Sequence, residues 1–298
     1  MPKIVQDPKT FGSLAVIASA ILYGCMPIGA QVIYETGCNA PTLALLRCTL
    51  PLPALWLLAQ WKGPPPAFSK GLPAKFFLLS SLGMVLTPVL LYSSYNHISS
   101  GAATTLHFIY PVFVMVGCVL FFREKLTPLR LVCILLCTAG IALFYIPQEA
   151  DSLLGMLLAL ASGFVYAVYI IYLGRVALPQ MNPFWITFFC SVAGAVLLLL
   201  YVPLSGQLAL PQTPFGWLFS FVFATTISVG AIVLFQTGVK IVGAQNASIL
   251  STFEPITSIL VGRVVFHEIL TVSTTLGILL ILAAVVVLTV FGKHKRTT

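Results

Sequence analysis

The amino-acid sequence predicts an all-α integral membrane protein with ten membrane-spanning helices. Of the 298 residues, 59% are hydrophobic and only 7% are charged, whereas a typical soluble domain carries about 25% charged residues. The apolar runs are long enough for helices to cross a bilayer, which takes about 20 residues. They also lack the alternation of polar and apolar residues that marks the strands of a membrane β-barrel.

Ten apolar runs cover most of the chain. The expected spans are residues 10–34, 41–61, 75–96, 100–122, 127–146, 152–174, 182–204, 214–239, 243–265 and 272–291. The first run resembles a signal peptide, but it continues to Ile33, past the small-residue motif at residues 18–20, so we expect a retained span. The longest connection, residues 62–74, is rich in proline, glycine and lysine and is expected to be a solvated loop. None of the connections is long enough for a soluble domain.

The distribution of lysine and arginine predicts that both termini are cytoplasmic. With a cytoplasmic N-terminus, thirteen of the fifteen basic residues fall in inner segments and none falls in an outer loop. The two others, Arg47 and Arg263, lie inside expected spans. Because cytoplasmic segments of membrane proteins carry the excess of Lys and Arg, this orientation explains the net charge of +8 without nucleic acid as a partner.

The second half of the sequence repeats the first. Residues 100–128 align without a gap on residues 244–272, and residues 12–23 align on residues 155–166. The matched pairs include Pro111 with Pro255, Glu124 with Glu268, Thr127 with Thr271, and Tyr23 with Tyr166. Each copy holds five expected spans, an odd number, so the second copy must enter the membrane from the opposite side. We therefore expect two inverted five-helix repeats, residues 1–148 and 149–298, an arrangement typical of secondary transporters.

Several motifs resemble the EamA-like members of the drug/metabolite transporter superfamily. They are PTLALLR at residues 41–47, Pro111 followed by FREKLTP at 122–128, and EP at 254–255 followed by FHEILTV at 266–272. The resemblance covers essentially the whole chain. It implies a permease of a bacterial inner membrane, usually an exporter of small metabolites or amino acids, and the family is too broad in function to imply one substrate.

Glu254 is the first candidate for a functional residue. A carboxylate in the middle of a span costs about 2.5–3.5 kcal/mol on insertion scales and usually faces the bundle interior or a water-filled cavity. It could bind a substrate cation, couple a proton gradient to transport, or form a gating ion pair. The alternative is a structural carboxylate that is hydrogen-bonded to a neighbouring helix.

Further polar residues are expected near Glu254, each with ordinary packing or snorkelling as the alternative. The predicted substrate-binding set is Glu254, His107, Tyr110, Tyr23, Tyr166, Arg47, Ser251 and Gln236. His107 and Tyr110 match Ser251 and Glu254 across the repeat. Arg47 can hold a carboxylate in a bidentate pair.

The matched Pro111 and Pro255 are expected to kink the fourth and ninth spans, because proline removes one backbone donor. The kinks would flank the site and let these helices bend as access switches. Glu124 and Thr127 are expected to join two helices instead, with Thr127 as an N-cap.

The sequence favours a transporter over an enzyme or a receptor. It contains no phosphate-binding loop, no HExxH motif and no Cys/His metal site, so no cofactor or metal is expected. The predicted partners are a small-molecule substrate, the lipid bilayer and, as a further candidate, protons. The leading hypothesis is alternating-access transport of small metabolites such as amino acids. The alternative is proton-coupled efflux of lipophilic cations.

Overall fold

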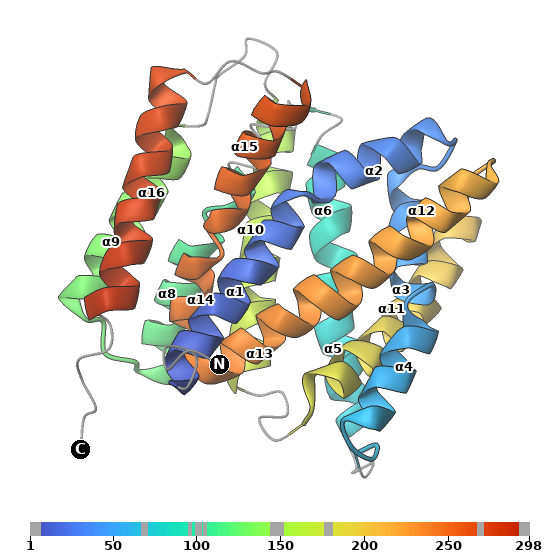
Figure 1. The fold of residues 1–298 in the computed structure, drawn as a ribbon, viewed down its shortest axis with the longest axis horizontal. Helices are drawn as coiled ribbons and strands as arrows, with labels where there is room; N and C mark the ends of the chain where they lie inside the picture. The colour runs from blue at the N-terminus through green and yellow to red at the C-terminus, as the bar shows by residue number, and fades with distance from the viewer. Residues whose placement is uncertain are drawn as a thin grey trace.

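The computed structural model of the chain describes residues 7–66, 71–94, 97–98, 103, 106–143, 152–175, 181–266 and 271–291. The described residues form helices joined by turns, with no β-strand in these ranges (Figure 1). Helices suit a chain of this composition, because a segment in a bilayer must satisfy its own backbone N–H and C=O groups.

The helices follow one another with short connections. In the first half they are α1 (Pro8–Gly24), α2 (Met26–Glu35), α3 (Ala40–Thr49), α4 (Leu52–Trp61), α5 (Leu72–Ser80), the π-helix η2 (Ser81–Leu86), α6 (Thr87–Ser94), α8 (Tyr110–Phe122) and α9 (Pro128–Ala142). In the second half they are α10 (Leu153–Arg175), α11 (Pro183–Leu204), α12 (Pro214–Thr225), the π-helix η3 (Thr226–Ile232), α13 (Val233–Val242), α14 (Ala244–Leu250), α15 (Phe253–Phe266) and α16 (Val272–Phe291).

Six helices in the described ranges are long and apolar enough to cross a membrane. They are Pro8–Glu35, Ala40–Trp61, Leu72–Leu91, Leu153–Gly174, Pro183–Leu204 and Pro214–Val242, and three shorter apolar helices are Tyr110–Phe122, Pro128–Ala142 and Thr275–Leu288. The count of ten spans and their direction stay predictions. Glu268 and the basic residues Lys3, Lys70, Lys293, Lys295 and Arg296 lie outside the described residues.

Local sequence signals explain where many helices begin. Proline occupies the first or second position of nine of them, from α1 to α12, where its missing N–H costs nothing. Side chains of Asn39 and Thr213 accept hydrogen bonds from the first-turn N–H groups of α3 and α12. The expected Thr127 cap is confirmed, because its Oγ1 accepts from the Arg130 N–H at 3.3 Å.

Two matched helices are interrupted by a turn. A turn at residues 108–109 precedes α8, and a turn at residues 251–252 separates α14 from α15. Pro111 is the second residue of α8 and Pro255 is the third residue of α15. Each proline therefore lies in the first turn of a helix that begins directly after a break. The role of the two prolines in bending during access switching stays a prediction. Pro255 has no N–H to donate to the Ser251 carbonyl oxygen. That oxygen instead accepts a hydrogen bond from the Glu254 N–H at 3.0 Å.

The π-helices η2 and η3 form a second matched pair, because they occupy equivalent places in the two repeats. A π-helix inserts extra backbone into a helix and often marks a functional site. Side-chain hydroxyls hydrogen-bond to carbonyl oxygens at both insertions. Ser19 Oγ of α1 donates to the Ala231 carbonyl oxygen at 2.7 Å, and Thr87 Oγ1 donates to the Leu82 carbonyl oxygen at 2.7 Å.

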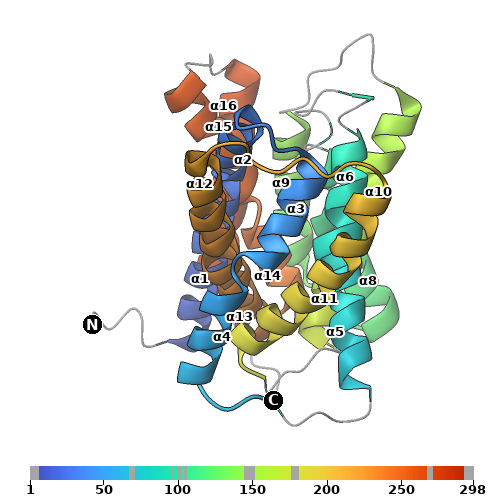
Figure 2. The same cartoon turned by 90° about the vertical axis from the view of Figure 1, so that its right-hand side faces the viewer.

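The two halves interleave. Helix α1 packs against η3, α13, α14 and α15 of the second half, while α10 packs against η2, α6 and α8 of the first half. Figure 2 shows most of the helices running between the same two ends of the molecule. The closest approach of α1 to α13 uses glycine, since a Cβ at Gly238 would overlap Val16 and lie 2.9 Å from the Gly12 carbonyl oxygen.

This packing predicts that Gly238→Ala destabilises the fold more than Gly230→Ala. A Cβ at Gly230 would meet only the end of the flexible Leu22 side chain, at 3.0 Å. Both changes gain about 1 kcal/mol in helix propensity, but overpacking at residue 238 costs about 1–3 kcal/mol. We expect a lower melting temperature for Gly238→Ala in detergent solution. Equal melting temperatures would contradict the close α1–α13 contact.

Candidate functional site

A cavity of about 160 Å³ lies among the interleaved helices of the two halves. It is lined by aromatic rings, small apolar residues, one acid and one arginine: Tyr23, Met26, Ala44, Arg47, Cys48, Gly83, Met84, Thr87, Pro88, Leu91, His107, Phe108, Tyr166, Tyr169, Ser228, Ile232, Phe235 and Glu254. One buried water needs about 10–15 Å³ of such space, so the cavity has room for roughly ten waters or one small solute. A mostly apolar wall with a few convergent polar groups is typical of ligand sites.

Five of the eight predicted binding residues line this cavity. They are Tyr23, Arg47, His107, Tyr166 and Glu254. They come from α1, α3, the segment before α8, α10 and α15. Helices of both halves therefore contribute to one site.

Glu254 lies in the first turn of α15, immediately after the helix break. In the described part of the chain, no hydrogen bond or ion pair to its carboxylate is found within the protein. The N-terminal turn of a helix carries unpaired N–H groups and a partial positive charge, which favour an anion. Gly24 of α1 makes room for this turn, since a Cβ there would lie 2.7 Å from the Glu254 carbonyl oxygen. The break thus places a carboxylate at the cavity wall.

Arg47 brings a positive charge to the same cavity. Its guanidinium interacts electrostatically with Glu254, but the ion pair found within 4.0 Å in the described ranges is Glu124 with Arg130. The Arg47 Nε atom is buried and has no hydrogen-bond partner among the residues that the structure describes. Ser228 Oγ of η3 donates to the Arg47 carbonyl oxygen at 3.2 Å, which ties α3 to the π-helix. The acid and the base therefore face one space without neutralising each other directly.

A cluster of aromatic rings surrounds Tyr166. Its ring centroid lies 4.9 Å from that of Tyr110, edge to face, and 5.7 Å from that of Tyr169, stacked. The His107 ring lies 5.6 Å away and the Phe235 ring 6.4 Å away. Ring faces attract cations, so this wall can hold either an apolar group or a cationic one.

His107 is 7% exposed and reaches the cavity wall. Its Nδ1 atom lies 2.8 Å from Ser162 Oγ of α10, and Ser162 Oγ in turn donates to the Ala159 carbonyl oxygen at 2.6 Å. The next residue, Gly163, lies against the backbone of His107, because a Cβ there would be 2.6 Å from the His107 carbonyl oxygen. Two consecutive residues of α10 therefore hold both the side chain and the backbone of His107.

The other three predicted residues lie outside the cavity lining. The Tyr110 hydroxyl is buried without a hydrogen-bond partner in the described structure. Ser251 Oγ donates to the Ala247 carbonyl oxygen at 2.9 Å. Gln236 is fully buried, and its Oε1 accepts from Thr187 Oγ1 at 3.1 Å. These three buried side chains therefore lie behind the residues that line the cavity.

Sequence reasoning missed several lining residues. Tyr169 follows Tyr166 by three positions, so helical spacing placed it on the same face. Ser228 lies in η3, and Thr87 directly follows η2. No local sequence pattern predicts the change in helical register that a π-helix introduces. Gly83 of η2 admits the Tyr169 ring, because a Cβ there would lie 2.7 Å from it.

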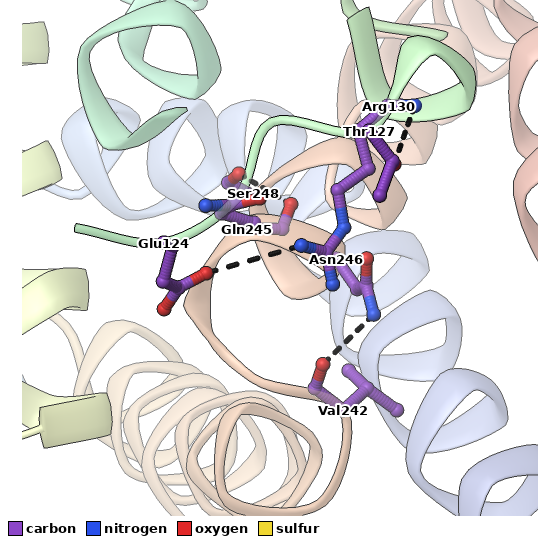
Figure 3. A network of polar contacts seen from close by, with 7 residues as sticks. All are labelled: Glu124, Thr127, Arg130, Val242, Gln245, Asn246 and Ser248. Atoms are coloured by element: carbon purple, nitrogen blue, oxygen red, sulfur yellow. Dashed lines mark hydrogen bonds and ion pairs between the residues drawn. The ribbon is translucent and has the colours of Figure 1, made fainter. Parts of the chain in front are cut away.

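A separate group of polar residues lies on the α8–α9 connection, the start of α9, the end of α13 and α14 (Figure 3). Arg130 Nη1 lies 3.9 Å from Glu124 Oε2, and Asn246 Nδ2 donates to the Val242 carbonyl oxygen at 2.9 Å. None of these residues lines the cavity, which agrees with a joining role for the Glu124–Thr127 element. In the ranges that the structure describes, no group of three His, Cys, Asp or Glu side chains could hold a metal ion.

Comparisons with known proteins identify a family, transporter relatives and a shared fold. The sequence model of the EamA-like transporter family matches residues 10–146 and again residues 153–290. An uncharacterized transporter of Synechocystis sp. is 29% identical over 96% of this chain and 95% of its own length. An uncharacterized transporter of Archaeoglobus fulgidus is 26% identical over 93% of this chain and 96% of its own length. A protein of known crystal structure shares the fold with a TM-score of 0.79 and 17% identity, over 94% of this chain and 98% of that chain.

The cavity predicts which side chains a water-soluble reagent can reach. In a background without the seven native cysteines, we expect Met84→Cys to react with a methanethiosulfonate reagent faster than Ser251→Cys. Met84 lines the cavity, whereas Ser251 is buried and does not. Labelling rates of the folded protein in detergent provide the measurement. A faster reaction at residue 251 would contradict the assigned wall.

Proposed function

We propose that this chain, which belongs to the EamA-like transporter family, carries a small organic solute with an ammonium group across the membrane by alternating access. The chain is a multi-pass membrane transporter. The observation that carries the proposal is the pair of opposite charges, Glu254 and Arg47, which line one cavity without an ion pair between them. An unpaired charge in a low-dielectric interior is costly, so a ligand that supplies both countercharges gains binding energy at this site.

The proposed architecture is ten helices in two inverted repeats, residues 1–148 and 149–298. Three observations support it. The family model matches each half separately, the interrupted helices and the π-helices occur in matched pairs, and α1 and α10 each pack on the opposite half. Midplane sites with discontinuous helices are typical of such transporters. The positive-inside distribution favours cytoplasmic termini.

The proposed substrate class is an amino acid or a related zwitterion. Glu254 would balance the ammonium group, and the Arg47 guanidinium would hold the carboxylate. The Tyr23 and Tyr166 rings would cover the rest of the solute. A solute of this size matches the cavity volume of about 160 Å³.

We propose an outward-facing state for this structure in the proposed orientation. Several lining residues, Met26, Ala44 and Leu91, belong to the predicted outer halves of their helices. Toward the opposite end, Val239 and Leu250 are buried in the hydrophobic core. Family resemblance favours export across a bacterial inner membrane, so this state would release the solute outside the cell.

The second candidate is efflux of lipophilic cations coupled to protons. The aromatic cluster next to Glu254 favours it, because rings and one carboxylate suit a delocalised cation. Arg47 disfavours it, because a second positive charge in the same cavity repels such a ligand.

Replacing Glu254 tests the proposed cation site and its coupling. We expect Glu254→Gln to abolish counterflow of labelled amino acids in proteoliposomes, because the amide cannot balance an ammonium charge. Glu35→Gln is the matched control, since Glu35 is exposed and is not one of the residues that line the cavity. We also expect an imposed pH gradient to accelerate uptake by the unsubstituted protein. Gradient dependence that persists in Glu254→Gln would exclude this residue as the proton carrier.

Replacing Arg47 separates the two candidate functions. If the substrate carboxylate binds Arg47, Arg47→Gln weakens binding of an amino acid by roughly tenfold or more, as a lost charged hydrogen bond does. The same change should leave binding of the corresponding decarboxylated amine unchanged or improve it. Thermal-shift titration with such pairs measures both affinities. Equal losses for both ligands would argue against a carboxylate site.

A further inference from the structure

We propose that Ser162 fixes the tautomer of His107, and that His107 Nε2 then accepts a hydrogen bond from the ammonium group that Glu254 balances. The cavity would thereby select ammonium groups that carry N–H bonds over fully alkylated ones. This inference rests on the proposed function and names a specificity determinant within the same site. His107 would contact the substrate, while Ser162 would be a positioning residue.

The hydrogen-bond chain determines which ring nitrogen carries the proton. A hydroxyl has one hydrogen to donate, and the 2.6 Å distance from Ser162 Oγ to the Ala159 carbonyl oxygen assigns that hydrogen to the carbonyl. Without a hydrogen between them, two oxygen lone pairs at this distance would repel. Ser162 Oγ must therefore accept from His107 Nδ1 at 2.8 Å. In the neutral imidazole, Nε2 is then left with a lone pair and no hydrogen.

The free nitrogen is open to the cavity. Among the described residues, the hydrogen bond of the His107 ring is made by Nδ1, and Nε2 is neither paired nor fully buried. His107 and Glu254 line the same cavity, and the proposal requires one bound ammonium group to contact both side chains. The position of the ring is also constrained, because Gly163 contacts the backbone of His107 while Ser162 holds the ring.

A site that combines the Glu254 carboxylate with the neutral acceptor His107 Nε2 would prefer a primary ammonium group to a trimethylated one. A primary ammonium group can donate one N–H to Glu254 and a second to His107 Nε2. A trimethylammonium group has the same charge and can lie against the tyrosine rings, but it has no hydrogen to donate. It would leave the Nε2 lone pair dehydrated and unpaired, which is the usual basis for rejecting an analogue that lacks a donor.

The test compares each of five amino acids with its N-trimethyl analogue. The probes are glycine, alanine, leucine, phenylalanine and lysine, and their affinities for the full-length protein are measured by thermal-shift titration and confirmed by competition in counterflow. For the unsubstituted protein we expect at least one amino acid to bind roughly tenfold or more tightly than its analogue. His107→Leu should reduce that ratio to near one, and Ser162→Ala should reduce it partly, because the released ring can present either tautomer.

The ratio of the two affinities distinguishes an effect on ammonium recognition from an effect on the folding of the protein. A merely structural role for either residue would weaken both ligands together and leave the ratio unchanged, and that result would overturn the inference. Ser191→Ala is the matched control, because Ser191 is an equally buried helical serine outside the cavity lining; it should keep the ratio. If the unsubstituted protein binds none of the probes, the proposed function and this inference both fail. If it binds amino acids with a ratio that His107→Leu does not change, only the inference fails.

Discussion

A bilayer offers no water to unpaired backbone groups, so a membrane helix can depart from regular geometry only where other groups satisfy it. In the described part of this protein, two matched pairs of such departures, the π-helices and the interrupted helices, border the central cavity. Ser19 hydrogen-bonds to the Ala231 carbonyl oxygen at one insertion. The Glu254 N–H bonds to the carbonyl oxygen that Pro255 leaves free. The backbone irregularities therefore give the site its shape.

The interrupted helix also explains how a carboxylate is tolerated next to a proline. Pro255 lies in the first turn of α15, where a backbone donor is not required. The same turn presents the positive end of the helix to Glu254. Both costly residues are thus accommodated in the same way, by a helix that begins inside the protein at the wall of the cavity.

The repeats agree in backbone and differ in side chains. Pro111 and Pro255 begin matched helices, but Tyr110 stands where the other half has Glu254. Tyr110 is buried against Tyr166, whereas Glu254 lines the cavity. In the proposed mechanism, the symmetry of the two repeats would allow exchange between an outward-open and an inward-open state. Asymmetry of the lining gives the cavity its charges and, in our proposal, its selectivity for an ammonium group.

The sequence by itself determined the membrane class, the helical segments, the internal repeat and five lining residues, because hydropathy, proline position and isolated charges are local properties. It also pointed to Glu254 as the costly residue that needs a cavity. Only the tertiary structure decided that Ser251, Tyr110 and Gln236 lie behind the wall, and that Thr87, Ser228 and Tyr169 lie on it. Which face of a helix meets the cavity depends on neighbours far away in the chain, such as Gly83 against Tyr169 or Ser162 against His107. Those contacts arise from packing between the two halves, which no local pattern of residues encodes.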